Sequence, residues 1–531
     1  VSKTLEYAYD DFCISEMAAK MGNEELAKTY KKRSFSFVNM FDPNTKFMRA
    51  RRGAQWYGPF DPSEVNFNYT EANSWQYSLY APHEIEVLTN LLGGRDSLEA
   101  WLDRLFTTEM KLSGREQADI TGLIGQYAHG NEPSHHMAYL YNYTNAPYKT
   151  QYYVDRILKE MYHAKPDGLS GNEDCGQMSA WYVLSSLGLY PIAPGSTIYQ
   201  IGRPFFSKAT IKVDNQTHAK IEIICNNQSA TNCYVASVKW NGKLIPNFQI
   251  DHQTLMSGGK LEFDMTDKMP AKSNYPQMNT VEIPADFVPA PFIKSEQRIF
   301  DQELYVEMGH VNLTPTDRYV LKYRLNNGPW NTYNQPVQLK ETTNIDLQLM
   351  RTNEQGISNE SAIVSSQFIR KNPNVSLTLN TVYSNQYAAS GPNALIDGLF
   401  GGNEFRTGDW QGYYGKDVVA TVQFKEPVSI HEIGASCIRD QKSWIFLPKE
   451  IRYEISYDGT SYQSPQIISV PAATSTDKNP FNQPFTQVIE TDKSRKVKSI
   501  RYTIVNPGNC PDWHLGAGNP TWLFVDELIF R

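Results

Sequence analysis

The hydrophobic pattern changes its period near residue 195. Before that point apolar residues recur three and four positions apart, as Leu5, Ala8 and Phe12 do, which is the period of an amphipathic helix. We predict helical runs, separated by loops rich in glycine, proline and asparagine, over residues 2–21, 23–41, 72–80, 83–92, 95–110, 119–129, 133–143, 149–161 and 175–187. Paired helices whose loops gather on one face are typical of an α/α toroid. We therefore predict part of an (α/α)6 toroid over residues 1–195.

From Tyr190 onward apolar and polar residues alternate, which is the period of a half-buried strand. Residues 209–213 and 220–224 follow this pattern, and Asn241-Gly242 has the composition of a tight hairpin turn. We predict a β-rich tail over 196–272, with a further turn at Gly258-Gly259. A segment rich in proline and asparagine, Met269–Pro291, is predicted to be a linker.

The remainder of the chain is predicted to form two β modules. Residues 292–368 form the smaller one, with a hairpin signal at 323–328. Residues 372–531 are predicted to form a β-sandwich, since apolar residues alternate from Ile451 to Tyr457 up to an Asp458-Gly459 turn. The predicted fold class is thus multidomain α + β, a partial (α/α)6 toroid followed by β-sandwich modules.

Composition excludes some partners. Of the 531 residues 20 % are charged, and the net charge of −7 comes without a long basic run, which argues against nucleic acid or an anionic membrane as a partner. No apolar run approaches the ~18 residues of a membrane span. Aromatic residues make up 12 % of the chain, which fits rings that stack on sugars and equally fits β-rich cores.

The start of the chain has no initiator methionine and no signal-peptide pattern. A helical pattern begins at Ser2, so we expect a C-terminal fragment of a longer protein. Six cysteines occur without any C-x-x-C motif, which makes a cysteine zinc site improbable. Cys225 and Cys233 flank a turn-like stretch and could form a disulfide, but two free thiols fit as well.

The first chemically dense segment spans residues 69–77. If Thr70 caps a helix, Glu71 lies in its first turn, and Trp75 lies four residues on along the same face. A carboxyl beside an indole in an apolar wall has a raised pKa and can act as a general acid. A glutamate in a first helical turn can also simply complement the helix dipole.

The second segment spans residues 129–136, with three histidines and Glu132. Pro133 suits the first position of a helix, which places His129 and Asn131 in the loop before it. The spacing matches no zinc motif, whereas oxygen ligands from Glu132 and Asn131 suit Ca²⁺. A capping loop with core histidines is the alternative.

The third segment spans residues 171–182, where Asn172, Glu173 and Asp174 precede an apolar helix. Asp174 stands where a helix cap belongs. Because one cap does not need this many polar groups, Asp174 is also a candidate base that positions water. With Glu71 it completes the pair of carboxyls that glycoside hydrolysis requires, whose separation decides between retention and inversion.

Four segments together resemble glycoside hydrolase family 92, a family of calcium-dependent, inverting exo-α-mannosidases found in many gut Bacteroidetes. They are Ser2–Asp11, Thr70–Tyr77, His129–Pro133 and Gly171–Trp181, and the resemblance runs from residue 1 to about 270. In this family a β-sandwich precedes the (α/α)6 toroid, so the resemblance implies that this chain begins inside the toroid.

The resemblance implies Glu71 as general acid and Asp174 as general base. It places His129, Glu132, Trp75 and Asn172 around the terminal mannose, and Glu132 with Asn131 at the calcium ion. Some family members carry a second aspartate two residues before the base, where this chain has Asn172. A base made of two carboxylates is therefore in doubt here.

The C-terminal modules resemble other families. Residues 292–368 are similar to the small immunoglobulin-like module of chitobiase-type enzymes. Residues 372–531 are similar to discoidin, or coagulation factor 5/8 type C, domains, which often bind sugars through loops. Arg406 and Trp410 are candidates for such contacts, although a tryptophan in a sandwich usually belongs to the core.

The resulting hypothesis is an inverting, calcium-dependent exo-α-mannosidase that releases mannose from glycans in the periplasm, at the cell surface or outside a bacterial cell. Its expected partners are mannose-containing glycans, without nucleic acid and without a membrane span. Two alternatives remain, a non-catalytic carbohydrate-binding or scaffold fragment and another toroidal glycosidase such as a glucoamylase-type enzyme.

Overall fold

The computed structural model describes residues 1–109, 111–213, 219–272, 282–477, 479–489 and 495–531. They divide into two compact units. Unit 1 comprises residues 1–296, 306–336 and 345–366, and unit 2 comprises 297–305, 337–344 and 367–531. The segment predicted as a single module over 292–368 thus contributes strands to both units. The chain is a multidomain α + β protein, as predicted.

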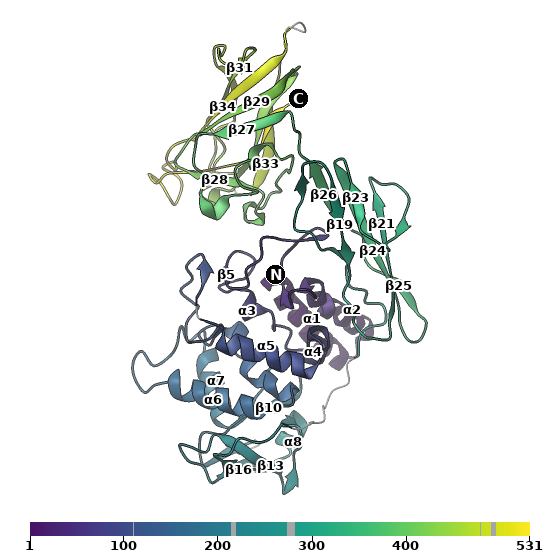
Figure 1. Cartoon of the computed structure of the whole chain (residues 1–531). Coiled ribbons are helices and arrows are strands. Elements are labelled where there is room, and N and C mark those ends of the chain that lie inside the picture. Colours follow the sequence, from purple (N-terminus) through teal and green to yellow (C-terminus); the bar gives the residue numbers. More distant parts are fainter. Residues whose placement is uncertain (110, 214–218, 273–281, 478, 490–494) are drawn as a thin grey trace. The chain divides into compact units, whose positions relative to one another are not determined.

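Unit 1 begins with two long helices (Figure 1). Helix α1 (Ser2–Lys20) packs against α2 (Glu24–Ser34), and Gly22, with φ of 75°, lies in the turn between them. Asn23 caps α2 by accepting a hydrogen bond from the Leu26 amide at 3.1 Å. A 3₁₀ helix η1 (Phe35–Met40) completes the second predicted run.

Five further helices in the described part of unit 1 contribute to one hydrophobic core. They are α3 (Ser74–Tyr77), α4 (Ile85–Leu92), α5 (Arg95–Thr107), α6 (Tyr148–Glu160) and α7 (Gln177–Ser186). The core residues include Leu5, Phe37, Trp101 and Trp181. Short antiparallel hairpins lie between helices: β1 (Phe41–Asp42) with β2 (Phe47–Met48), and β3 (Arg51–Arg52) with β4 (Gln55–Trp56).

Two predicted helices are not α-helical. Residues 119–129 contain a hairpin of β7 (Leu123–Ile124) and β8 (Tyr127–Ala128), because Gly122 and Gly125 both adopt φ of 61°, a conformation that α-helices exclude. Residues 133–143 form two 3₁₀ helices, η2 (Glu132–Ser134) and η3 (Met137–Tyr143). The end of the run predicted over 95–110 falls on Met110, which lies outside the described residues.

The β-rich tail forms a five-stranded sheet in the order β11-β12-β16-β13-β14. Its strands are β11 (Lys208–Lys212), β12 (Lys220–Asn226), β13 (Tyr234–Trp240), β14 (Lys243–Leu244) and β16 (Gly259–Thr266). A smaller sheet joins β9 (Leu189–Tyr190), β10 (Ile198–Ile201) and β15 (Gln249–Asp251), followed by α8 (His252–Met256). Asn241 and Gly242 have φ of 48° and 79°, which confirms the predicted hairpin turn.

Cys225 and Cys233 are free thiols, as are the other four cysteines. Cys225 on β12 lies opposite Phe263 of β16, whereas Tyr234, next to Cys233, lies opposite Thr266 on the other side of β16. Two strand spacings are about 10 Å, beyond the ~7 Å that a disulfide tolerates between Cα atoms. The register therefore excludes the disulfide that the sequence left open.

The predicted linker packs against the rest of unit 1 around Phe287, whereas Met269 at its start is exposed. Phe287 contacts Phe35 at 5.5 Å between ring centroids, and its carbonyl accepts a 2.7 Å hydrogen bond from Arg351, whose guanidinium also pairs with Asp317. Residues 273–281 of that prediction lie outside the described part. Further strands of unit 1 are β5 (Glu64–Val65), β6 (Ser113–Gly114), β17 (Phe292–Ile293), β20 (Met308–Gly309), β21 (Arg318–Leu325), β22 (Asn331–Thr332) and β25 (Ser358–Glu360). Strands β24 (Thr343–Thr352) and β26 (Val364–Arg370) cross the unit boundaries.

Unit 2 is built around a β-sandwich, as predicted. One sheet has the order β27-β29-β34-β31-β32 and the other β28-β35-β30-β33. The strands are β27 (Val375–Leu379), β28 (Gln411–Tyr414), β29 (Val418–Val428), β30 (Glu432–Arg439), β31 (Glu450–Ser456), β32 (Gln466–Ser469), β33 (Phe481–Val488), β34 (Val497–Val505) and β35 (Trp522–Phe530). Shorter elements of the unit are β18 (Ile299–Phe300), β19 (Leu304–Val306), which ends in unit 1, β23 (Val337–Leu339), and the 3₁₀ turns η4 (Asn385–Tyr387), η5 (Ala394–Ile396), η6 (Phe405–Thr407) and η7 (Gln441–Ser443).

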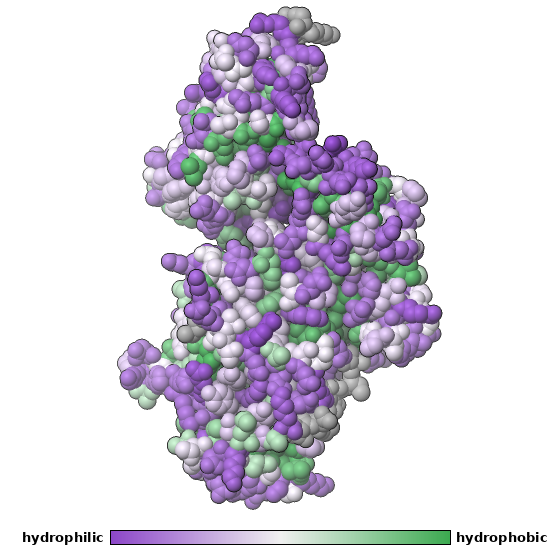
Figure 2. Space-filling model, in the orientation of Figure 1, coloured by the Kyte–Doolittle hydropathy of each residue, from purple (hydrophilic) through white to green (hydrophobic). Residues whose placement is uncertain are grey.

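The surface is mainly hydrophilic on the face drawn in Figure 2, with hydrophobic residues in separate patches. In the described part of the chain, no helix is long and apolar enough to span a bilayer. Trp410 is fully buried in unit 2 and its Nε1 donates to the Gly402 carbonyl. It belongs to the sandwich core.

Candidate active site

Glu71 lies in the turn that precedes helix α3. The helix is capped by Asn73, whose side chain accepts from the Gln76 amide at 3.3 Å while Gln76 Oε1 accepts from the Asn73 amide at 3.0 Å. The prediction that Thr70 caps the helix and that Glu71 lies in its first turn is therefore wrong. Glu71 instead has a left-handed φ of 53°, which is strained for a residue with a side chain and is often found at functional sites.

The electrostatic surroundings of Glu71 favour its protonated form. Partial burial raises the pKa of this carboxyl, the charges of Asp119 and Asp174 raise it further, and Arg115 opposes them. A carboxyl with a raised pKa can hold the proton that a general acid must deliver.

Asn131, the last residue of the loop before η2, and Glu132, the first residue of η2, lie near Glu71. Asn131 Nδ2 donates to the main-chain carbonyl of Glu71 at 3.1 Å, and Pro133 lies in the first turn of η2, as predicted for the start of a helix. Burial raises the pKa of Glu132, and so do the charge of Asp174 and a hydrogen bond between the two side chains. A main-chain hydrogen bond lowers this pKa. Glu71, Glu132 and Asp174 thus influence one another.

Asp174 lies on the loop before helix α7, three residues ahead of its first residue, Gln177. Its neighbour Glu173 takes the capping role, since its carboxylate accepts from the Ser179 amide and hydroxyl at 3.0 Å each. The Asp174 side chain is exposed. Asp174 and Cys175 have left-handed φ angles of 50° and 56°, so the second candidate catalytic residue also lies on strained backbone.

Two glycines bring the Glu132 and Asp174 loops into contact. A Cβ atom on Gly130 would lie 2.3 Å from the Ser170 carbonyl oxygen, and one on Gly171 would lie 2.9 Å from the Gly130 carbonyl oxygen. Thr121 Oγ1 donates to the same Ser170 carbonyl at 3.1 Å. Only the absence of side chains permits this approach.

His129 is a fully buried ring with both nitrogens engaged. Nδ1 lies 2.8 Å from the Tyr127 hydroxyl and Nε2 lies 2.7 Å from the Tyr162 hydroxyl, while the Trp181 ring meets it edge-on at 4.5 Å. Burial lowers its pKa well below the ordinary value, so the ring is neutral. Its predicted contact with mannose stays a prediction.

Trp75 is placed in the hydrophobic core of unit 1. It is 6 % exposed and meets Phe47 edge-on at 4.7 Å and Trp101 at 5.2 Å between ring centroids. The guanidinium of Arg104 lies 5.4 Å from its ring. A stabilising role in the core accounts for these contacts. Asn172 is exposed on the Asp174 loop, and the sugar contacts predicted for Trp75 and Asn172 stay predictions.

The oxygen-rich chemistry of the site suits a hard cation. Carboxylates that raise one another's pKa are relieved when a cation lies between them, and Glu132 with Asn131 supplies carboxylate and amide oxygens. Within the described residues, no three histidine, cysteine, aspartate or glutamate side chains are grouped to hold a metal ion. A calcium ion here would therefore need main-chain, water or sugar oxygens as well.

Sequence reasoning missed three groups that act on Glu71. Asp119 and Arg115 lie in the stretch before the β7–β8 hairpin, and Glu6 lies on α1. Asp119 was predicted as the first residue of a helix, and no residue pattern linked it to Glu71.

Comparisons with known proteins bring in a family model and individual relatives. Residues 1–267 match the glycosyl hydrolase family 92 catalytic domain. A protein of Arthroderma benhamiae described as an uncharacterized secreted glycosidase is 26 % identical over 291 residues, which are 50 % of this chain and 35 % of that protein. A family GH92 alpha-mannosidase from Bacteroides thetaiotaomicron is 40 % identical, with a TM-score of 0.46, over 50 % of this chain and 34 % of that one.

For the C-terminal part, an F5/8 type C domain of a Bacteroides fragilis protein is 15 % identical over 29 % of this chain and 89 % of that domain, with a TM-score of 0.20. The chain spans about a third of the length of the secreted glycosidase and of the alpha-mannosidase described above. Because the match to the family covers half of its residues, the chain belongs to glycosyl hydrolase family 92.

Proposed function

We propose that this protein is an inverting, calcium-dependent exo-α-mannosidase, with Glu71 as general acid and Asp174 as general base. The observation that carries the proposal is that two carboxyls from distant segments, each on left-handed backbone shortly before a helix, lie close enough for the charge of Asp174 to raise the pKa of Glu71. A third carboxyl, Glu132, forms a hydrogen bond with Asp174 and is affected by the charge of Glu71. Two such groups are what single-displacement glycoside hydrolysis requires.

In this mechanism Glu71 donates its proton to the departing glycosidic oxygen. Its raised pKa keeps that proton in place until the bond breaks. Asp174, exposed and released from helix capping by Glu173, accepts a proton from the attacking water on the opposite face of the sugar. The products are β-mannose and the shortened glycan.

Glu132 and Asn131 are the proposed calcium ligands. Bound there, Ca²⁺ would supply positive charge that holds sugar hydroxyls and offsets the clustered carboxylates. Asn131 also orients the Glu71 main chain through its amide. One loop would thus serve both the ion and the general acid.

The wider setting is part of the proposal. Helices α1 to α7 would form the C-terminal part of an (α/α)6 toroid that the rest of a longer enzyme completes. The likeness to a secreted glycosidase supports action outside the cytoplasm, on mannose-containing glycans.

The test compares Glu71→Gln and Asp174→Asn with wild type in the full-length protein. Each is expected to lower kcat on an α-linked mannobiose by about a thousandfold or more, because a group used in the transition state is lost. Glu173→Gln is the matched control, since its carboxylate caps α7, and its kcat should stay within about tenfold of wild type. Wild-type turnover in either catalytic variant contradicts the assignment.

Three further measurements test the rest of the proposal. NMR of the first-formed product should show β-mannose, and α-mannose would contradict inversion. EDTA should abolish activity and Ca²⁺ should restore it. An α-glucobiose should not be cleaved, whereas its preferential cleavage would favour a glucoamylase-type enzyme.

A second function, sugar binding by unit 2, is favoured by one exposed ring. Trp513 is 43 % exposed beside His514, while Arg406 is engaged with both carboxylate oxygens of Glu404. Trp513→Ala in the whole protein should abolish retention on immobilised glycans. Unchanged retention would remove this ring from consideration.

A further inference from the structure

The first turn of helix α1 forms hydrogen bonds with the chain immediately before Glu71. The Ser2 amide donates to the Asn68 carbonyl at 3.2 Å. The Ser2 hydroxyl accepts from the Thr70 amide at 3.1 Å and lies 2.8 Å from the Thr70 hydroxyl. Ser2 is 4 % exposed, so water competes little for these hydrogen bonds.

One turn further along α1, a second contact holds the other side of Glu71. Glu6 Oε1 accepts a 2.6 Å hydrogen bond from the hydroxyl of Tyr77, the last residue of α3. Tyr77 is 1 % exposed. The two turns of α1 therefore hold the chain six residues after Glu71 and one residue before it.

Glu71 needs such support because its backbone is strained. A left-handed conformation costs a side-chain-bearing residue on the order of 1 kcal/mol, and it persists only where the surroundings impose it. Ser2 holds the amide of residue 70, while Asn131 holds the carbonyl of residue 71 from the other side. The Asn131 bond fixes the peptide unit that follows the Glu71 Cα atom, and the Ser2 bond fixes the peptide unit between residues 69 and 70, one residue before the unit that precedes it.

We propose that Ser2 is a positioning residue for the general acid, acting through Thr70. The inference rests on the proposed function, in which Glu71 protonates the leaving group. A displacement of about 1 Å at a proton donor can cost about a hundredfold in rate. Ser2 itself touches neither the substrate nor the reacting atoms.

The test is Ser2→Ala in the full-length protein, assayed on two substrates. An α-linked mannobiose needs protonation of its leaving oxygen, whereas 2,4-dinitrophenyl α-mannoside has a leaving group that departs without it. We expect kcat on mannobiose to fall about tenfold or more with KM within about twofold, and kcat on the dinitrophenyl substrate to stay within about twofold.

Ser15→Ala is the matched control. Ser15 is on the same helix, is 5 % exposed, and its hydroxyl donates to the Ala27 carbonyl at 2.8 Å. It should leave both rates within about twofold of wild type. Thr70→Val, at an exposed position, removes the other hydroxyl without disturbing the core and should give a smaller loss confined to mannobiose. It also tests the proposal if Ser2→Ala fails to fold.

Equal losses of kcat on both substrates in Ser2→Ala would overturn the positioning role. An unchanged kcat on mannobiose in both Ser2→Ala and Thr70→Val would overturn it as well. The failure of the underlying assignment looks different. If Glu71→Gln itself slows both substrates equally, or slows neither, Glu71 is not the general acid. If Glu71→Gln slows only mannobiose and Ser2→Ala slows neither substrate, Glu71 remains the general acid and the positioning role of Ser2 is contradicted.

Discussion

The side-chain amide of Asn131 donates a 3.1 Å hydrogen bond to the main-chain carbonyl of Glu71. Residues 60 positions apart in the sequence are thereby joined, which ties the Glu71 turn to the segment that carries Glu132. The bond acts on the backbone of a residue whose φ is 53°, so it orients the Glu71 side chain without touching the carboxyl.

Asn131→Asp should separate this orienting role from metal binding. Aspartate keeps an oxygen ligand for a cation but replaces the donor with a group that repels the Glu71 carbonyl. We expect kcat on α-mannosides to fall about tenfold to a hundredfold, while the calcium concentration for half-maximal activity changes little. If calcium dependence shifts and kcat at saturating calcium does not, the hydrogen bond does not support catalysis.

Gly130→Ala should disrupt the contact between the Glu132 and Asp174 loops. The new methyl would lie 2.0 Å from Thr121 Oγ1 and 2.3 Å from the Ser170 carbonyl oxygen, and the carbonyl can move only if its loop moves. We expect kcat to fall by at least about a hundredfold. Gly402→Ala is the control, because that position has ordinary φ and nothing within 4 Å of the added atom. Wild-type kinetics in Gly130→Ala would show that the loops tolerate separation.

Much of the site could be predicted from the sequence because its residues cluster locally. Glu132 begins a 3₁₀ helix, and Glu71 and Asp174 each lie three residues before a helix; polar residues that interrupt an apolar pattern mark such places. The prediction that Glu71 and Trp75 share a helix face is wrong, because four-residue spacing has this meaning only where both residues are helical, and the helix begins at Ser74. Asn73 and Gln76 form the capping box that begins the helix later, a signal that the sequence does contain.

The fold was harder to predict where glycine decides the backbone. The stretch from Asp119 to His129 carries apolar residues at spacings that fit a helix, yet left-handed Gly122 and Gly125 turn it into a hairpin. In contrast, Asn241-Gly242 was predicted correctly, since that pair specifies its turn without help from tertiary contacts. Long-range effects such as that of Asp119 on Glu71 leave no local pattern.

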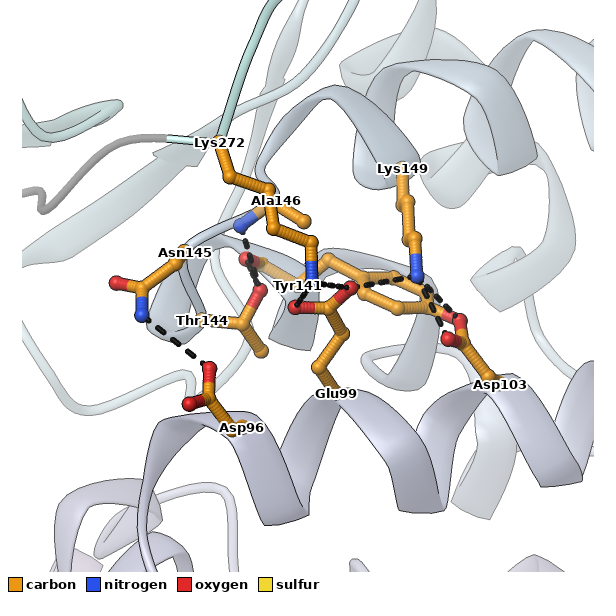
Figure 3. A network of polar contacts seen from close by, with 9 residues as sticks. All are labelled: Asp96, Glu99, Asp103, Tyr141, Thr144, Asn145, Ala146, Lys149 and Lys272. Carbon is orange, nitrogen blue, oxygen red and sulfur yellow. Dashed lines mark hydrogen bonds and ion pairs between the residues drawn. The ribbon is translucent and has the colours of Figure 1, made fainter.

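A network of charged side chains around the buried Glu99 ties α5, α6 and the segment at Lys272 together (Figure 3). Glu99, with its side chain 5 % exposed, accepts from Lys149 at 2.7 Å and from Lys272 at 2.8 Å. Burial raises the pKa of Glu99, but the two lysines outweigh it and hold the net pKa below its usual range. Lys149 also contacts Asp103.

Glu99→Ala should therefore destabilise unit 1, by about 1–3 kcal/mol in a chemical unfolding experiment, because it removes the group that Lys149 and Lys272 share. Glu160→Ala is the control: its pair with Arg156 lies on an exposed helix face, and its loss should cost less than about 0.5 kcal/mol. Equal effects of the two variants would mean that the buried network adds no stability.

Buried carboxyls in unit 2 make its stability depend on pH. Burial raises the pKa of Glu527 to about 9, with the charges of Asp397 and Asp526 adding to it and the Gly398 amide opposing. The folded state thus binds a proton more tightly than the unfolded chain does. Its contribution to stability is complete below the ordinary pKa of 4.5 and is lost as pH rises toward 9.

Glu527→Gln removes this dependence. In EDTA, where no divalent cation neutralises the carboxyls, calorimetry should show the wild-type melting temperature falling between pH 5 and 9, and the variant should fall less and melt higher at pH 8. The reason is that one pKa unit corresponds to about 1.4 kcal/mol between protonation states. Asp458→Asn provides a contrast of opposite sign, because amide hydrogen bonds from Thr460 and Ser461 lower the pKa of that carboxyl. A Glu527→Gln variant that melts lower than wild type at pH 8 would show that the ionised carboxylate, held by the Gly398 amide, stabilises unit 2 instead.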